Sequence, residues 1–182
     1  MIRLFVALDF PEDVRQRLAG LGGGVPGARW TEAENLHLTL RFIGEVPEDQ
    51  AAEIDDALSQ ISAPAFDVTL DGVGVFGSGR NARVLWARVE RSDALSHLQS
   101  KVESALVRCG LPAEERKFSP HITLARLKDA PKDRIGRFIE ERGLFRAGPI
   151  RMEHFTLYRS HLGKGAAVYE ALREYPLDMG PG

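Results

Sequence analysis

Two segments of the chain carry a histidine and a threonine in the same order, each at the same point of a repeated series of elements. The chain runs strand, helix, strand, helix, strand twice, with a period of roughly 80 residues. Hydrophobic periodicity predicts strand Leu4–Phe10, a helix from Pro11, strand Leu36–Ile43, helix Pro47–Gln60 and strand Phe66–Phe76, then strand Arg83–Glu90, helix Asp93–Arg108, strand Phe118–Leu127, helix Pro131–Arg142 and strand Ile150–Tyr158, with a final strand Ala167–Tyr175. A duplicated chain of this kind is expected to form two similar lobes, with a cleft between them that suits a small-molecule site.

The balance of charges argues against one class of function. Lys and Arg total 24 and Asp and Glu total 26, a formal net charge of −2. General electrostatic binders of nucleic acid are normally clearly basic, so any such contact is expected only at a local site. Cys109 is the one cysteine, which fits a reducing, cytoplasmic setting. Asp9 and Pro11 interrupt the N-terminal apolar stretch, so neither a signal peptide nor a membrane helix is expected.

The polar faces of the two histidine-bearing strands carry the candidate catalytic residues. Side chains alternate between the faces of a strand, so His37, Thr39 and Arg41 are expected to share one face. His121 and Thr123 share a face in the same way. Histidine has an ordinary pKa of about 6.5 and can act as base or acid near neutral pH. Two histidines on opposite sides of a phosphorus atom can divide those roles, while threonine hydroxyls donate to its non-bridging oxygens, without a metal.

The pattern His-x-Thr-Leu occurs a third time, at residues 154–157. That strand is the last of its half and is out of register with the other two. The corresponding region of the first half, Asp71–Phe76, has no histidine. We therefore interpret His154 as an incidental strand histidine.

The segments Asn35–Phe42 (NLHLTLRF) and Ser119–Arg126 (SPHITLAR) resemble the twin His-x-Thr-x motifs of the two-histidine phosphoesterases. They are most similar to those of the RNA 2′,3′-cyclic phosphodiesterases, also called 2′-5′ RNA ligases. The resemblance implies an α+β fold with a bilobal internal duplication, in which two sheets flank a central cleft and helices lie on the outside. We expect one phosphoesterase domain over residues 1–182, with repeats at roughly 2–76 and 83–160 and a final strand over 167–175.

The resemblance also implies an activity: hydrolysis of a terminal 2′,3′-cyclic phosphate on RNA to a 2′-phosphate, without metal or cofactor. Matched by motif position, His37 is the proton donor to the leaving 3′ oxygen and His121 is the acceptor that activates water. Thr39 and Thr123 match the hydroxyls that hold the phosphate. Arg126 matches the arginine after the second motif, but it is out of phase with His121 and needs a bulge or a strand end to reach the site. Arg41 is in phase and is a further candidate to bind substrate.

Three other functions are compatible with parts of this pattern. A metal hydrolase would need several converging His, Asp or Glu ligands, and the histidine faces of the motif strands lack carboxylates. A non-catalytic RNA- or nucleotide-binding module would tolerate loss of either histidine. A phosphodiesterase for small cyclic nucleotides would share the same chemistry. The expected partners are RNA ends with a cyclic phosphate, tRNA halves among them, joined in some cases by ATP-independent 2′-5′ ligation, and the expected protein is a cytoplasmic monomer with no membrane contact.

Overall fold

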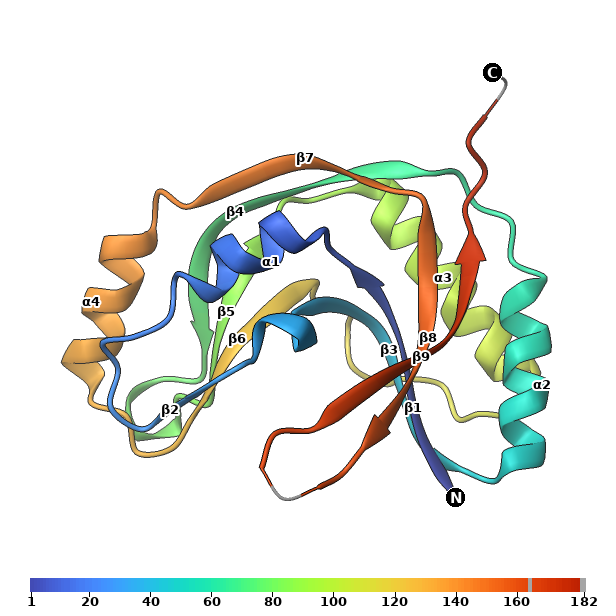
Figure 1. Cartoon of the computed structure of the whole chain (residues 1–182), viewed down its shortest axis with the longest axis horizontal. Helices are drawn as coiled ribbons and strands as arrows, with labels where there is room; N and C mark the ends of the chain where they lie inside the picture. Colours follow the sequence, from blue (N-terminus) through green and yellow to red (C-terminus); the bar gives the residue numbers. More distant parts are fainter. Residues whose placement is uncertain (164, 181–182) are drawn as a thin grey trace.

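The computed structural model describes residues 1–163 and 165–180. Its chain forms two antiparallel sheets that curve around a common centre, with helices on the outside (Figure 1). The elements are β1 (Ile2–Asp9), α1 (Glu12–Ala19), β2 (Ala28–Trp30), β3 (His37–Val46), α2 (Glu48–Ser59), β4 (Phe66–Phe76), β5 (Val84–Val89), α3 (Asp93–Arg108), β6 (His121–Leu127), α4 (Lys132–Arg142), β7 (Arg146–Met152), β8 (His154–His161) and β9 (Val168–Pro176), with 3-10 turns at Ala33–Asn35 and Gly79–Asn81. The expectation of an α+β chain with two sheets is confirmed.

The two sheets do not coincide with the two halves of the sequence. One sheet has the strand order β3-β1-β8-β9 and the other β2-β6-β5-β4-β7. Strand β4 of the first half therefore pairs with β5 of the second half, and β8 of the second half pairs with β1 of the first. Each half contributes an interior strand to the sheet of the other half.

Two boundaries differ from the sequence-based expectation. The predicted strand Ile150–Tyr158 is two strands, β7 and β8, separated at Glu153. The chain changes sheets there, because β7 pairs with β4 and β8 pairs with β1. Period-two alternation continues through such a crossing, so it cannot reveal which partner each part will find. The short strand β2, which pairs with β6, was not predicted.

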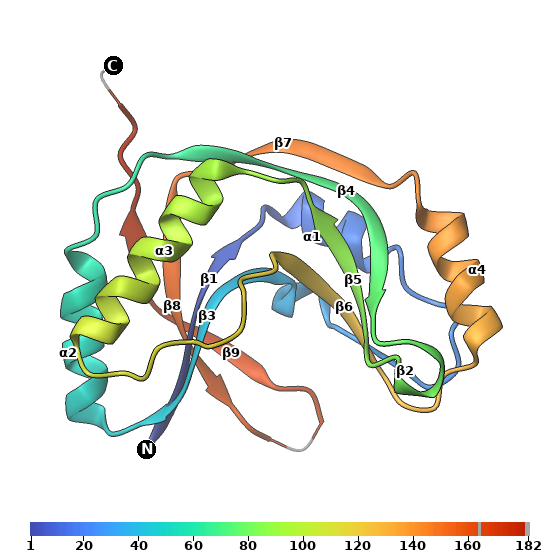
Figure 2. The ribbon, with the colours of Figure 1, turned by 180° about the vertical axis from the view of Figure 1, so that it is seen from behind.

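Apolar faces of the motif strands pack into the core and leave their polar faces toward the centre. Leu38 and Leu40 of β3 are 0% and 3% exposed, and Ile122 and Leu124 of β6 are 0% and 3% exposed. Helix α3 packs against β3, with α2 beside it, and α4 packs near β4 at the other end of the molecule (Figure 2). The buried side of α3 is made by the apolar residues that the helical spacing indicates: Leu95, Leu98, Val102, Ala105 and Leu106. The Ser92 side chain caps this helix by accepting from the Leu95 amide at 3.1 Å.

Within the described residues, the helices are too short or too polar to cross a bilayer.

Gly74 of β4 provides a test of how closely the second sheet is packed. It lies directly opposite Trp86 of β5, and a Cβ at position 74 would meet the indole ring. Gly74→Ala is expected to lower the free energy of unfolding by about 1–3 kcal/mol, because overpacking forces the ring aside. Gly136→Ala in α4 is the matched control, since a Cβ there meets nothing within 4 Å and alanine is the better helix former. Urea denaturation measures both, and equal stabilities for the two variants would contradict the packing argument.

Candidate active site

His37 lies in a cluster of aromatic rings on the inner face of the first sheet. Its ring stacks on Phe5 at 5.0 Å and on Tyr158 at 5.7 Å, and meets the edge of Tyr169 at 5.1 Å between centroids. Asp9 is its direct partner across the β1–β3 ladder. Burial in this apolar setting lowers the pKa of His37 to about 4, although the Asp9 carboxylate acts in the opposite direction. His37 is therefore neutral at pH 7 in the free protein.

His121 has a different environment in the second sheet. Its Nδ1 lies 2.7 Å from the carbonyl oxygen of Ser119. A carbonyl can only accept, so this contact assigns the ring proton to Nδ1 and leaves the Nε2 lone pair free. The rings of Phe76 and His121 make a T-shaped contact, with 4.8 Å between their centroids. His121 is thus oriented to accept a proton through Nε2.

Both motif strands contain a bulge one residue after the threonine. In β3, Ala7 opposes Thr39 and Val6 opposes Arg41, so Leu40 is the extra residue. In β6, Trp86 opposes Thr123 and Leu85 opposes Ala125, so Leu124 is the extra residue. A bulge reverses the faces of all residues that follow it. The residue five positions after each histidine consequently returns to the histidine face, namely Phe42 in the first strand and Arg126 in the second.

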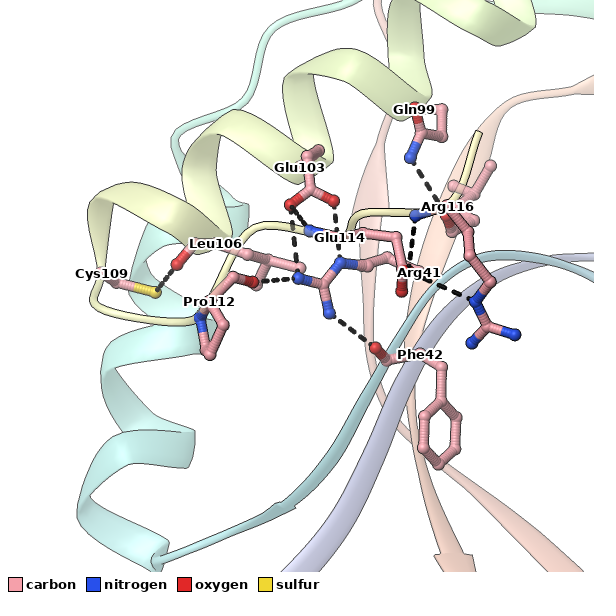
Figure 3. A network of polar contacts seen from close by, with 10 residues as sticks. Arg41, Phe42, Gln99, Glu103, Leu106, Cys109, Pro112, Glu114 and Arg116 are labelled. Atoms are coloured by element: carbon pink, nitrogen blue, oxygen red, sulfur yellow. Dashed lines mark hydrogen bonds and ion pairs between the residues drawn. The ribbon is translucent and has the colours of Figure 1, made fainter. Parts of the chain in front are cut away.

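The expectation that Arg41 shares a face with His37 is wrong, and the bulge at Leu40 is the reason. The Arg41 side chain is 8% exposed and extends toward Glu103 of α3, where Arg41 also lines the cavity that contains His121. Its Nε donates to Glu103 Oε2 at 2.8 Å and its Nη1 to the Phe42 carbonyl at 2.7 Å, while Nη2 donates to Glu103 Oε1 and the Pro112 carbonyl (Figure 3). This ion pair holds the pKa of Glu103 below its usual range. Arg41 joins β3 to α3 and to the loop after it.

Arg126, in contrast, lies on the histidine face of its strand, as predicted from the motif with a bulge. The bulge that its position required is present, and its exposed side chain lines the cavity next to His37. That cavity has a volume of about 210 Å³ and is lined by Arg3, Phe5, His37, Thr39, Phe42, Arg126, Ser160, Leu162, Ala167 and Tyr169.

An adjoining cavity of about 340 Å³ contains His121. Its lining includes Thr39 and Phe42, which also line the His37 cavity, so the two cavities adjoin at these residues. Strands β3 and β6 run next to each other at this point (Figures 1 and 2). Thr123 lines neither cavity; it is half-buried opposite Trp86, two residues along the same strand from His121. The structure therefore brings His37, Thr39, His121 and Arg126 to one region, with Thr123 at its edge.

Sequence reasoning missed Phe42, an aromatic side chain that is 46% exposed and faces both cavities. One signal could have found it, because Phe42 follows His37 by the same five residues that separate Arg126 from His121. The aromatic cluster of Phe5, Tyr158 and Tyr169 comes from three different strands and had no such signal.

The third His-x-Thr segment lies in the same sheet as the first. His154 Nε2 is 3.0 Å from Asp9 Oδ1 and 3.7 Å from Glu174 Oε1. Only β1 separates its strand from β3. In the part of the chain that the structure describes, these three residues form the one group of acidic and imidazole side chains close enough to share a cation, with ligand atoms within 4.8 Å of each other. The His154 side chain therefore makes its shortest polar contact with the Asp9 carboxylate.

Two sheets that each direct a His-x-Thr strand toward a common region define the architecture of a two-histidine phosphoesterase. Comparison with known proteins gives the family: the model of LigT-like phosphoesterases matches residues 8–86 and again 88–169, once on each half. The chain belongs to the LigT-like phosphoesterase family.

Individual relatives agree with this assignment. An RNA 2′,3′-cyclic phosphodiesterase of Thermotoga maritima is 34% identical over 185 residues, covering 98% of this chain and 97% of the relative. A protein of the same name from Archaeoglobus fulgidus is 30% identical over 177 residues, covering 96% and 99%. Among solved structures, E. coli LigT in complex with 3′-AMP aligns with a TM-score of 0.76 at 30% identity, covering 97% of this chain and 98% of that one.

The different positions of Arg41 and Arg126 can be tested by making the same substitution at each. Arg41→Gln is expected to lower the free energy of unfolding by about 1–3 kcal/mol, because it leaves the Glu103 carboxylate and two carbonyl groups without their charged donor. Arg126→Gln, at an exposed site, is expected to stay within about 0.5 kcal/mol. Since pairing lowers the pKa of Glu103, the deficit of Arg41→Gln shrinks as the pH falls through that pKa. Urea denaturation at several pH values measures this, and similar losses for the two variants would contradict the assignment.

Proposed function

We propose that the protein hydrolyses terminal 2′,3′-cyclic phosphates on RNA to 2′-phosphates by paired histidine acid–base catalysis without a metal. One observation carries the proposal: the two His-x-Thr strands adjoin, and Thr39 and Phe42 belong to the cavities of both histidines. The family assignment supports the same chemistry, because relatives across the full chain are named RNA 2′,3′-cyclic phosphodiesterases.

In the proposed first step, His121 takes a proton from the attacking water. The Ser119 carbonyl holds the Nδ1 proton, so the Nε2 lone pair receives the proton from water. The water oxygen forms a bond to phosphorus while the bond from phosphorus to the 3′ oxygen breaks. His37 gives its proton to that leaving oxygen, which becomes the 3′-hydroxyl, and the phosphate stays on the 2′ oxygen. Thr39 and Arg126, which line the His37 cavity, donate to the non-bridging oxygens as their charge grows, and Thr123 at the edge of the site takes the same role in the proposal.

Because its pKa is low, His37 can act as the general acid only when the bound substrate causes its ring to be protonated. An imidazole with a pKa of about 4 is neutral at pH 7 and lacks the imidazolium proton that a general acid donates. A bound phosphodiester brings a negative charge next to the ring, and an adjacent opposite charge raises the pKa of a histidine. The anionic substrate therefore generates the acid on binding, while the free site holds a neutral ring.

The proposal also includes a monomeric protein in the cytoplasm that acts on tRNA halves. A second proposed reaction is ATP-independent 2′-5′ ligation, which is the reverse of a related transesterification. The free thiol of Cys109 fits a reducing location; its pKa is raised by burial, and its Sγ contacts the Leu106 carbonyl at 3.3 Å.

Replacing the two histidines tests the activity. His37→Ala and His121→Ala are each expected to lower kcat about 10²–10⁴-fold on an oligonucleotide with a cyclic phosphate end, and the double variant to be little worse than either. EDTA is expected to leave the rate unchanged and the product to be a 2′-phosphate. His97→Ala is the control, because His97 lies on the exposed side of α3 and lines neither histidine cavity.

Three outcomes would count against the proposal. A 3′-phosphate product would reverse the donor and acceptor roles. Loss of activity with EDTA would make Asp9, His154 and Glu174 the first candidates for a metal site. Unchanged RNA binding with no hydrolysis in the wild type would favour the non-catalytic module.

The titration of His37 is the second test. NMR of the ring protons is expected to give a midpoint near pH 4 for the free protein and a higher midpoint with a saturating nucleoside 2′-phosphate. Because the folded pKa lies below the ordinary value of about 6.5, acidification protonates the unfolded chain first. Stability is therefore complete above about pH 6.5 and falls toward pH 4, and His37→Gln lacks this component. The control His97→Gln, on the exposed side of α3, keeps it. A midpoint near 6.5 in the free protein would refute the role of burial, and a midpoint unmoved by ligand would refute the acid role.

A further inference from the structure

Two arginines face each other directly across the β2–β6 ladder. Arg29 of β2 is the register partner of Arg126 of β6, and both side chains are exposed. Partners directly opposite in an antiparallel ladder have their Cβ atoms only about 5 Å apart, and like charges at such positions destabilise the sheet. The sequence thus retains an unfavourable pair in a strand of only three residues.

No protein group neutralises this pair among the residues that the structure describes. Neither guanidinium lies within ion-pair distance of a carboxylate there, although other arginines of the chain do, such as Arg41, Arg151 and Arg173. Glu32 lines the same cavity, but it contacts neither arginine as an ion pair. Departures from the rules of sheet stability are expected at functional sites, where a ligand supplies what the fold lacks.

The arginine pair lies in a cavity that continues from the His37 cavity. This second cavity has a volume of about 270 Å³ and contains Arg29, Glu32 and Asn35. Arg126, Leu162, Ala167 and Tyr169 line both cavities, so Arg126 stands at the junction. Asn35 Nδ2 donates to the Ala167 carbonyl at 2.9 Å and fixes the wall on the side of the β8–β9 hairpin.

We propose that Arg29 and Arg126 bind the 5′-phosphate group of the terminal nucleotide, which in RNA is the phosphodiester to the preceding nucleotide. This inference rests on the proposed function, because it takes the cyclic phosphate to occupy the His37 cavity. A guanidinium pairs with phosphate oxygens in a bidentate fashion, and two of them supply the charge that a phosphodiester needs. Arg126 then lies between the two phosphates, and Arg29 serves the second alone.

The arrangement selects the substrate by its length. A nucleoside 2′,3′-cyclic phosphate has no group for Arg29, whereas the end of an RNA chain has one. Binding energy obtained away from the reacting bond raises kcat/KM for the longer substrate. The second cavity therefore separates RNA ends from small cyclic nucleotides, which share the reacting group.

The test compares two substrates in three proteins. The substrates are adenosine 2′,3′-cyclic phosphate and the dinucleotide ApA with a terminal 2′,3′-cyclic phosphate. Wild type is expected to prefer the dinucleotide, and Arg29→Gln to lower the ratio of the two kcat/KM values about tenfold to a hundredfold, as loss of a charge-assisted hydrogen bond would. Arg137→Gln on α4 removes the same charge at an exposed position outside the cavities described, and is expected to leave the ratio unchanged. An unchanged ratio in Arg29→Gln would overturn the proposal.

A third substrate separates two sources of the second phosphate. Adenosine 2′,3′-cyclic phosphate with a 5′-monophosphate offers the same chemistry without a preceding nucleotide. If Arg29→Gln affects this compound alone and not the dinucleotide, the pair serves a nucleotide monoester and the assignment to RNA ends is overturned.

A binding measurement keeps the inference independent of catalysis. Affinity for the non-reactive ApA 2′-phosphate is measured by titration at several salt concentrations. For single strands the slope of log K against log salt changes by about 0.7 for each phosphate contact, so Arg29→Gln is expected to reduce the slope by about that amount. If the wild type hydrolyses neither substrate, the proposed function fails, while the slope still decides whether Arg29 binds the second phosphate. An equal slope in wild type and variant would refute it.

Discussion

The site depends on a constraint of strand geometry: neighbouring side chains of a β-strand point to opposite faces, and one extra residue reverses the order. Up to the threonine, each motif strand gives its apolar side to the helices and its polar side to the cleft. The bulges at Leu40 and Leu124 then exchange the sides. Because of this exchange, Arg41 bonds to Glu103 of α3, while Phe42 and Arg126 line the cavity that contains His37.

The sequence predicts the four α-helices, the strands other than β2 and the two histidine faces, because these follow from local periodicity. It does not predict what depends on a partner strand. The position of a bulge is decided by the ladder, so Arg41 was misplaced and Phe42 was missed. The same holds for the division of residues 150–158 between two sheets, which alternation alone cannot indicate. Arg126 was placed in the site by resemblance, with a bulge as the stated condition, and the structure contains that bulge.

The two imidazoles have unlike surroundings although their strands are related. Aromatic rings on three strands enclose His37 and keep it neutral, whereas a backbone carbonyl fixes the tautomer of His121. An acid and a base need such a difference, since two identical histidines would titrate together. Strand duplication supplies the placement of the groups, and the neighbouring side chains supply their distinct chemistry.

Strands β4 and β8 each lie in the sheet formed mainly by the other half of the chain, and this exchange connects the two walls of the cleft. A cut in the connection between residues 76 and 84 would leave each fragment without an interior strand of its own sheet, so neither fragment is a self-sufficient folding unit. Pairings between distant parts of the chain also make folding slow, because the loops must close before the contacts form. In the folded protein, the shared strands join the two walls of the cleft, because β4 and β8 are each hydrogen-bonded to a strand from the other half.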